Sequence, residues 1–146
     1  MQSIRIYEIP DGRMVSSAVG MFGEEAFDAF DVWMSKQPRG IFPRDFLTWD
    51  AEKQGFRWLY LYEEGMEVPA PMEIIDFKGG LYAVATDIDQ QTDKPALDQE
   101  VKAFLAQHGL VMDKSRPQMG NVITPPGARE ILGYEQMDYY YPVTIG

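Results

Sequence analysis

The hydrophobic pattern of the chain is strongest over residues 55–62, where an aromatic side chain occupies every second position. Successive side chains of a β-strand point to opposite faces, so this alternation predicts a strand. One face would carry Phe56, Trp58, Tyr60 and Tyr62, and the other would carry Arg57 together with leucines that suit packing against a helix. The aromatic face is a candidate lining for an apolar cleft that can still form directed hydrogen bonds. The alternative is that these rings are ordinary core residues.

The rest of the pattern divides into two similar series of elements. Helices are predicted over residues 24–37 and 95–108, since each has apolar side chains at helical spacing and a Pro or Gly stop signal. Strands are predicted over residues 4–9, 45–49, 55–62, 81–86, 121–124 and 136–145, with further apolar runs at 13–19 and 72–77.

The order strand, helix, strand, strand therefore occurs twice, at about residues 1–65 and 72–146. We expect an α+β fold in which residues 1–146 form a single domain built from two such repeats, of the SHS2 type. Two units of this kind usually share one antiparallel sheet, with both helices on one face and a ligand cleft on the other.

Composition narrows the function classes. The 146 residues include 23 acids and 13 bases, which gives a net charge of −10 and disfavours direct binding of DNA or RNA. The same charge would attract cationic small molecules or a basic protein partner. The chain has no cysteine, which excludes disulfides and thiol chemistry. We find no apolar run long enough to cross a membrane and no signal peptide, so we expect a cytoplasmic protein.

Four segments carry a further signal when they are taken in order. They are residues 42–62, Phe-Lys-Gly-Gly-Leu-Tyr-Ala-Val at 77–84, the helix that stops at Gly109, and the tyrosine-rich segment 133–143. Together they resemble the GyrI-like effector-binding domain family over nearly the whole chain. The resemblance implies an aromatic cleft between two strand-helix-strand-strand units that accepts bulky, often cationic, organic molecules.

The same resemblance suggests a biological setting. Members of the family occur fused to DNA-binding domains of the MerR and AraC regulator types, and also as stand-alone proteins. Because we see no helix-turn-helix segment before or after the domain, we expect the stand-alone form.

One position departs from the family pattern. The family often places a glutamate in the strand after the second helix, where this chain has Asn121, which can form hydrogen bonds but cannot neutralise a cation. Asp138 is the nearest substitute because alternation puts it on the same face as Tyr140. Other acids that could take this role are Glu63, Glu64 and Glu135.

The candidate ligand-binding residues are Trp58, Tyr60, Tyr62, Tyr82, Asn121, Asp138 and Tyr140. Tyr139 and Tyr141 have the opposite parity on the last strand, and a register slip of one residue would exchange the two sets.

Metal and cofactor chemistry find little support in the sequence. His108 is the only histidine, and its place near the end of the second predicted helix indicates a core or capping residue. Without cysteines a usual zinc site cannot form, so we expect no metal and no cofactor.

The function that this sequence favours is a stand-alone effector-binding or multidrug-binding protein for hydrophobic, in some cases cationic, small molecules. It would act in transcription regulation or sequestration and would need no catalytic residue. A first alternative is a hydrolase of reactive natural products on the same fold, although the sequence shows no nucleophile-base pair. A second is a protein-interaction module such as a gyrase inhibitor.

Overall fold

The computed structural model describes residues 3–38 and 45–146 and divides the chain into two compact units. Asp11–Lys78 form one unit, which we call the central unit because it comes from the middle of the sequence. Met1–Pro10 and Gly79–Gly146 form the other, which we call the terminal unit.

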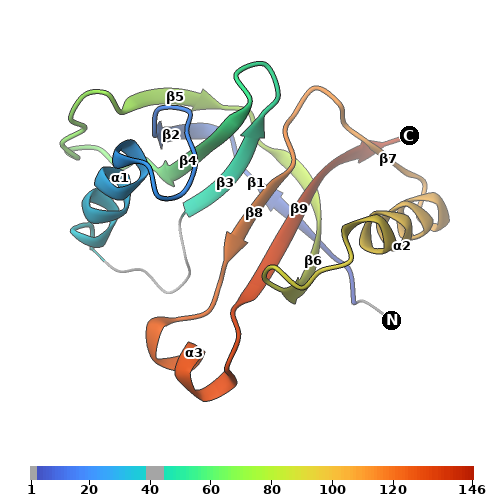
Figure 1. Cartoon of the computed structure of the whole chain (residues 1–146). Helices are drawn as coiled ribbons and strands as arrows, with labels where there is room; N and C mark the ends of the chain where they lie inside the picture. The colour runs from blue at the N-terminus through green and yellow to red at the C-terminus, as the bar shows by residue number, and fades with distance from the viewer. Residues whose placement is uncertain (1–2, 39–44) are drawn as a thin grey trace. The chain divides into compact units, whose positions relative to one another are not determined.

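The central unit is an antiparallel sheet with one helix (Figure 1). Its strands run in the order β3-β4-β2-β5. The elements are β2 (Gly12–Ser16), α1 (Glu25–Ser35), β3 (Asp45–Asp50), β4 (Gly55–Leu61) and β5 (Glu73–Phe77).

Helix α1 packs on the sheet of the central unit through its aromatic side chains. Phe30 and Trp33 are buried together with Val15 of β2 and Tyr60 of β4. Fully burying side chains of this size contributes about 1.5–3 kcal/mol each. The acidic first turn of α1 suits the positive end of the helix dipole.

The terminal unit is a second antiparallel sheet, with strands in the order β1-β6-β9-β8 and with β7 also paired to β9. Its strands are β1 (Arg5–Ile9), β6 (Gly80–Ile88), β7 (Leu110–Met112), β8 (Met119–Val122) and β9 (Gln136–Ile145). Its helices are α2 (Lys94–Gln107) and α3 (Pro126–Leu132).

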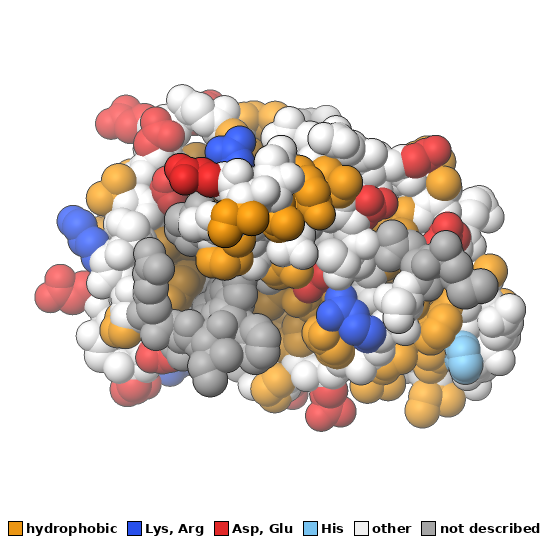
Figure 2. Space-filling model, turned by 90° about the horizontal axis from the view of Figure 1, so that it is seen from below, with side chains coloured by type: hydrophobic (Ala, Val, Ile, Leu, Met, Phe, Trp, Pro, Cys, Tyr) orange, Lys and Arg blue, Asp and Glu red, His pale blue; other side chains and the backbone are white. Residues whose placement is uncertain are grey.

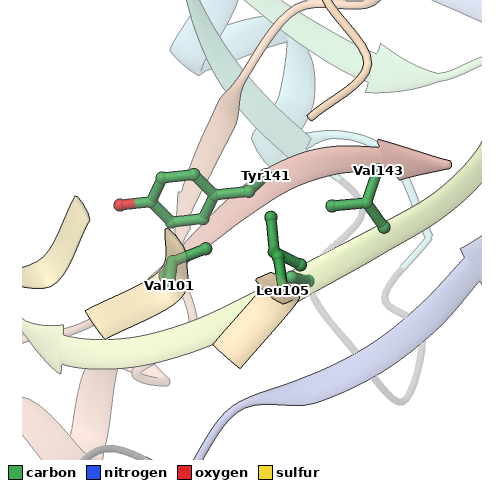
Figure 3. Close-up of a cluster of buried hydrophobic side chains, with 5 residues drawn as sticks. Val101, Leu105, Tyr141 and Val143 are labelled. Atoms are coloured by element: carbon green, nitrogen blue, oxygen red, sulfur yellow. The ribbon is translucent and has the colours of Figure 1, made fainter. Parts of the chain in front are cut away.

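Helix α2 covers one face of the terminal sheet. Figure 3 shows Val101 and Leu105 of α2 pointing toward Tyr141 and Val143 of β9. Asp93 caps the start of the helix by accepting a hydrogen bond from the Ala96 backbone N–H at 3.1 Å.

His108 lies at the other end of α2 as its C-cap residue, as the sequence indicated. Its ring packs at a tilt against that of Phe104, with the centroids 4.4 Å apart. The side chain is exposed, and Figure 2 shows the single histidine of the chain at the surface. The same figure shows acidic side chains spread over this face.

The α+β class and the antiparallel pairing of the strands are confirmed. The limits of the compact units differ from those of the predicted repeats because β1 and β5 each pair with a strand of the other predicted repeat. β1 pairs with β6 of the terminal unit, and β5 pairs with β2 of the central unit. The sequence analysis did not include β7 or α3, and residues 42–44 of the family resemblance lie outside the described residues.

Over residues 3–38 and 45–146, none of the helices has the length and apolar character of a membrane-spanning segment.

Candidate functional site

Four of the predicted site residues share one face of the terminal sheet. Residues directly opposite each other on neighbouring antiparallel strands point to the same side of the sheet. Asp138 lies opposite Asn121 on β8 and Thr86 on β6, and strand alternation adds Tyr140 and Tyr82 to that side. We call this side the distal face because it points away from α2.

The opposite parity of β9 faces α2. Tyr141 donates a hydrogen bond from its hydroxyl to Asp98 Oδ1 of that helix at 2.7 Å, and burial raises the pKa of Tyr141. Tyr139 donates to Thr92 Oγ1 at 3.1 Å. The register of β9 therefore places Tyr140 and Asp138, not Tyr139 and Tyr141, on the distal face.

Asp138 is buried and already has a cationic partner. Arg5 of β1 donates from Nη2 to Asp138 Oδ1 at 3.3 Å, and the Thr86 hydroxyl donates to the same oxygen. Arg5 also donates from Nη1 to the Tyr7 hydroxyl at 2.7 Å and from Nη2 to Thr86 Oγ1 at 2.8 Å. The side chain of Asp138 is 7% exposed and that of Arg5 is 39% exposed. The acid predicted to hold a cationic ligand thus has its charge balanced within the protein.

Buried polar atoms without partners lie near this ion pair. Within the described part of the chain, three buried side-chain atoms have no hydrogen-bond partner: Asn121 Oδ1, the Tyr82 hydroxyl and Arg116 Nη1. The rings of Tyr82 and Tyr140 meet edge to face, with centroids 6.1 Å apart. Burial raises the pKa of Tyr140 to about 12, and the Asp138 carboxylate acts in the same direction. The distal face therefore combines aromatic rings with unused hydrogen-bonding capacity.

A buried arginine holds the loop before β8 against the sheet. Arg116 donates to the backbone carbonyls of Leu81 and Val143 at 3.0 and 2.8 Å and pairs with Asp113 at 2.8 Å. Its Cζ lies 4.8 Å from the centroid of the Tyr82 ring. Hydrogen bonds from Ser115 and then from Arg116 hold the pKa of Asp113 well below its usual range. This network fixes one side of the Tyr82 ring.

The predicted aromatic residues of β4 lie on the helix side of the central sheet. Trp58 contacts Phe27 and Phe30 of the α1 side, with ring centroids 5.7 Å apart in both pairs. Tyr60 meets Trp33 of α1 edge to face at 5.6 Å. The expectation that leucines face the helix and aromatics face an open cleft is wrong in orientation, because both faces of β4 are largely apolar and aromatic rings pack on a helix as readily as leucines.

Tyr62 lies just beyond the end of β4 and is partly buried against the same core. Its ring has the Arg13 guanidinium 4.8 Å from its centroid. A ligand-binding role for these three β4-side residues stays a prediction, and their placement favours the core alternative.

The central sheet has polar residues on its face away from α1, and of these the sequence pattern predicted Arg57 but not its partners. Arg57 donates to Asp50 Oδ2 at 3.2 Å and to Ser16 Oγ at 3.4 Å, and Thr48 lies opposite it on β3. Ser16 and Thr48 are buried. Arg57 is the only charged residue of β4, and a charge in this apolar strand was the available signal for its partners.

A further missed residue is the half-buried acid Asp45 at the start of β3. Trp58 donates from Nε1 to Asp45 Oδ2 at 2.9 Å. Burial raises the pKa of Asp45 despite this hydrogen bond. The carboxyl group belongs to the α1 side of the central sheet because Asp45 lies opposite Tyr60.

The central unit also carries an open hollow of about 860 Å³. It lies between the C-terminal end of α1, around Trp33 and Lys36, and the connector formed by residues 63–69. None of the seven predicted ligand-binding residues belongs to its described lining. In the described residues, no group of three His, Asp or Glu side chains is placed to hold a metal ion.

No family model matches the sequence, and no curated protein matches it significantly. Solved structures do match. The EcmrR C-terminal domain aligns with a TM-score of 0.63 at 10% identity, over 100% of this chain and 99% of that one. EcmrR in a complex with DNA aligns with a TM-score of 0.67 at 10% identity over 99% of this chain, which spans 58% of the EcmrR chain.

Two further structures resemble the chain over almost its full length. A hydrolase from Listeria innocua has a TM-score of 0.67 at 12% identity, with 97% of this chain and 91% of that chain covered. SAV2435 bound to tetraphenylphosphonium has a TM-score of 0.55 at 11% identity, with 97% and 95% covered. At these identities the likeness is one of fold, and the fold is consistent with the GyrI-like one.

Proposed function

We propose that this chain binds hydrophobic small molecules on the distal face of the terminal unit, through Tyr82, Asn121, Asp138 and Tyr140. The observation that carries the proposal is that Asn121 Oδ1 and the Tyr82 hydroxyl on that face, together with Arg116 Nη1 beside Tyr82, are buried without a hydrogen-bond partner among the described residues. Buried polar groups in proteins nearly always have a hydrogen-bond partner. A bound molecule with complementary groups that reached these buried side chains, of which Tyr82 is 0% and Tyr140 8% exposed, would supply one and would contact the tyrosine rings.

The fold neighbours support the same class of function. SAV2435 was solved with tetraphenylphosphonium, a bulky aromatic cation, and EcmrR was solved on DNA. We therefore propose an effector-binding protein linked to transcription regulation or sequestration, and we keep multidrug binding and membership of the GyrI-like family as parts of the proposal. A cytoplasmic location stays a prediction.

Two matched substitutions on β9 test the proposed face. Tyr140→Leu removes a ring from the distal face, while Tyr139→Leu removes the neighbouring ring from the α2 face. Calorimetric titration of the full chain would use triphenylmethanol, which is neutral, and methyltriphenylphosphonium, which has a similar shape and a positive charge.

We expect Tyr140→Leu to weaken binding of the better ligand about tenfold. We expect Tyr139→Leu to change the dissociation constant of that ligand by no more than about twofold. Equal effects of the two changes would contradict the proposed face.

The hydrolase alternative has one observation in its favour, since a structural neighbour from Listeria innocua is called a hydrolase. A general base must be free to take a proton from water. On the distal face the carboxylate of Asp138 instead accepts hydrogen bonds from Arg5 and Thr86. Turnover of an electrophilic substrate that is lost in Asp138→Asn would support this alternative.

The protein-interaction alternative, such as inhibition of gyrase, stays a prediction. A net charge of −10 suits a basic partner surface, which is a general property of acidic proteins and selects no particular partner.

A further inference from the structure

Arg5 is in the position that a cationic ligand of Asp138 would take. Its Nη2 lies 3.3 Å from Asp138 Oδ1, and the carboxylate is buried while the arginine is partly open to water. The guanidinium is also held by Tyr7, through the hydroxyl at 2.7 Å and through the ring, whose centroid is 5.1 Å from Arg5 Cζ. Strand β1 therefore supplies a fixed positive charge to the distal face.

This arrangement changes which ligands gain from Asp138. A cation that approaches the carboxylate meets a charge that is already balanced, and two cations beside one buried carboxylate leave an excess positive charge. The cation binds well only if Arg5 moves away and gives up charge-assisted hydrogen bonds, which are stronger than neutral ones. A neutral ligand leaves the ion pair between Arg5 and Asp138 intact, so its binding does not cost these hydrogen bonds.

The unpartnered atoms indicate what a neutral ligand should carry. Asn121 lies directly opposite Asp138, and its Oδ1 accepts hydrogen bonds but cannot donate them. The Tyr82 hydroxyl can do both. A planar or multi-ring aromatic molecule with an O–H or N–H group would satisfy Asn121 Oδ1 and stack on the tyrosine rings.

We infer that Arg5 is a specificity-determining residue that occupies the Asp138 carboxylate, so that the distal face selects neutral aromatic hydrogen-bond donors over organic cations. This inference rests on the proposed small-molecule binding and names its ligand class. It differs from the expectation that Asp138 takes the place of a cation-binding glutamate.

The test compares two arginine substitutions that change the net charge equally. Arg5→Met removes the internal cation and keeps an apolar stem. Arg13→Met is the control, because Arg13 is likewise paired with an acid, Glu64, and placed over a tyrosine ring, but in the central unit. Each variant is titrated calorimetrically with triphenylmethanol and with methyltriphenylphosphonium, after its thermal unfolding has shown that it is folded.

In the wild-type chain we expect triphenylmethanol to bind more tightly than methyltriphenylphosphonium. Arg5→Met should raise affinity for the cation about tenfold, with little change for the neutral compound. Arg13→Met should change neither. The higher affinity for the cation should disappear in the double variant Arg5→Met/Asp138→Asn, because that variant has no carboxylate to pair with the cation. Arg5→Lys keeps a charge at this place and should keep the wild-type preference.

Two contrary results have different meanings. If the compounds bind but the ratio of their affinities is the same in wild type and Arg5→Met, the role of Arg5 is overturned and the proposed binding function stands. If neither compound binds to any folded variant, the proposed function itself is overturned, and the inference falls with it.

Discussion

The buried Asp138 and the half-buried Asp45 have carboxyl groups that are stabilised in different ways. Asp138 lies against the Arg5 guanidinium and the Thr86 hydroxyl. Asp45 receives a hydrogen bond from the Trp58 indole, and its burial raises its pKa. A carboxylate that is buried without a cation is costly in its charged form, so these two acids should affect stability differently.

Replacing Asp45 tests the effect of its burial on stability. Its pKa is raised above the ordinary value of 3.8, so the folded state holds the proton more tightly than the unfolded state does. The free energy of unfolding should therefore fall as the pH rises from about 3.8 through the folded-state pKa. Asp45→Asn keeps an acceptor for Trp58 and should remove this fall, which leaves the variant at least as stable as wild type at pH 7. Urea unfolding of wild type and variant at a series of pH values measures this dependence of the free energy of unfolding on pH.

Asp50 is the matched control for this experiment. Hydrogen bonds, first from the Lys53 backbone N–H, lower its pKa. Its charged form is therefore favoured in the fold, and the stability that it contributes is present above pH 3.8 and is lost on acidification. Asp50→Asn should destabilise the protein at pH 7. An Asp45→Asn variant with the same pH profile as wild type would contradict the account of its burial.

At the scale of elements, the start of β6 depends on the absence of a side chain at Gly80. Its φ of +146° is unfavourable for other residues, and a Cβ there would lie 2.8 Å from Arg116 Cζ. Gly80→Ala should destabilise the fold by about 1–3 kcal/mol, because it strains the backbone and displaces the guanidinium that holds Tyr82.

Gly127 in α3 provides the comparison, since a Cβ there would meet nothing within 4 Å. Gly127→Ala should be neutral or stabilise the chain by up to about 1 kcal/mol. Denaturant titration of both variants measures the difference. Equal stability of the Gly80 and Gly127 variants would show that Arg116 adapts without cost.

The sequence predicted the elements better than it predicted their partners. Alternation correctly put Asp138 and Tyr140 on one face, because side-chain parity is a local property of a strand. Parity does not say which face a helix will cover, and for β4 the expected orientation was wrong. Arg5 was missed as a partner of Asp138 because the pairing of β1 with β6 joins distant parts of the chain.

Short elements with weak signals account for the other differences. Strand β7 has only the three residues Leu110–Met112, too few to show alternation. Helix α3 begins at Pro126 directly after another proline, in a stretch that had the composition of a turn. Neither element contributes a residue to the proposed site.

At the scale of the whole molecule, a fold consistent with the GyrI-like one restricts the function without determining it. Similar structures include one called a hydrolase and one solved with an aromatic cation. Fold likeness at this level of identity does not transfer chemistry, which depends on particular side chains. The ligand class that we propose for this chain depends on the side chains of Arg5, Asn121 and Asp138, and a comparison of folds does not take side chains into account.

The most direct test of the account is to locate the bound molecule. Backbone amide NMR spectra of the full chain would be recorded during titration with triphenylmethanol, with the tryptophan indole signals observed in parallel. We expect the shifts to concentrate on β6, β8 and β9 around Tyr82, Asn121 and Tyr140. The indole signals of residues 33, 49 and 58, all in the central unit, would shift less. Shifts centred on Trp58 and α1, with none at Asn121, would contradict a binding site on the distal face.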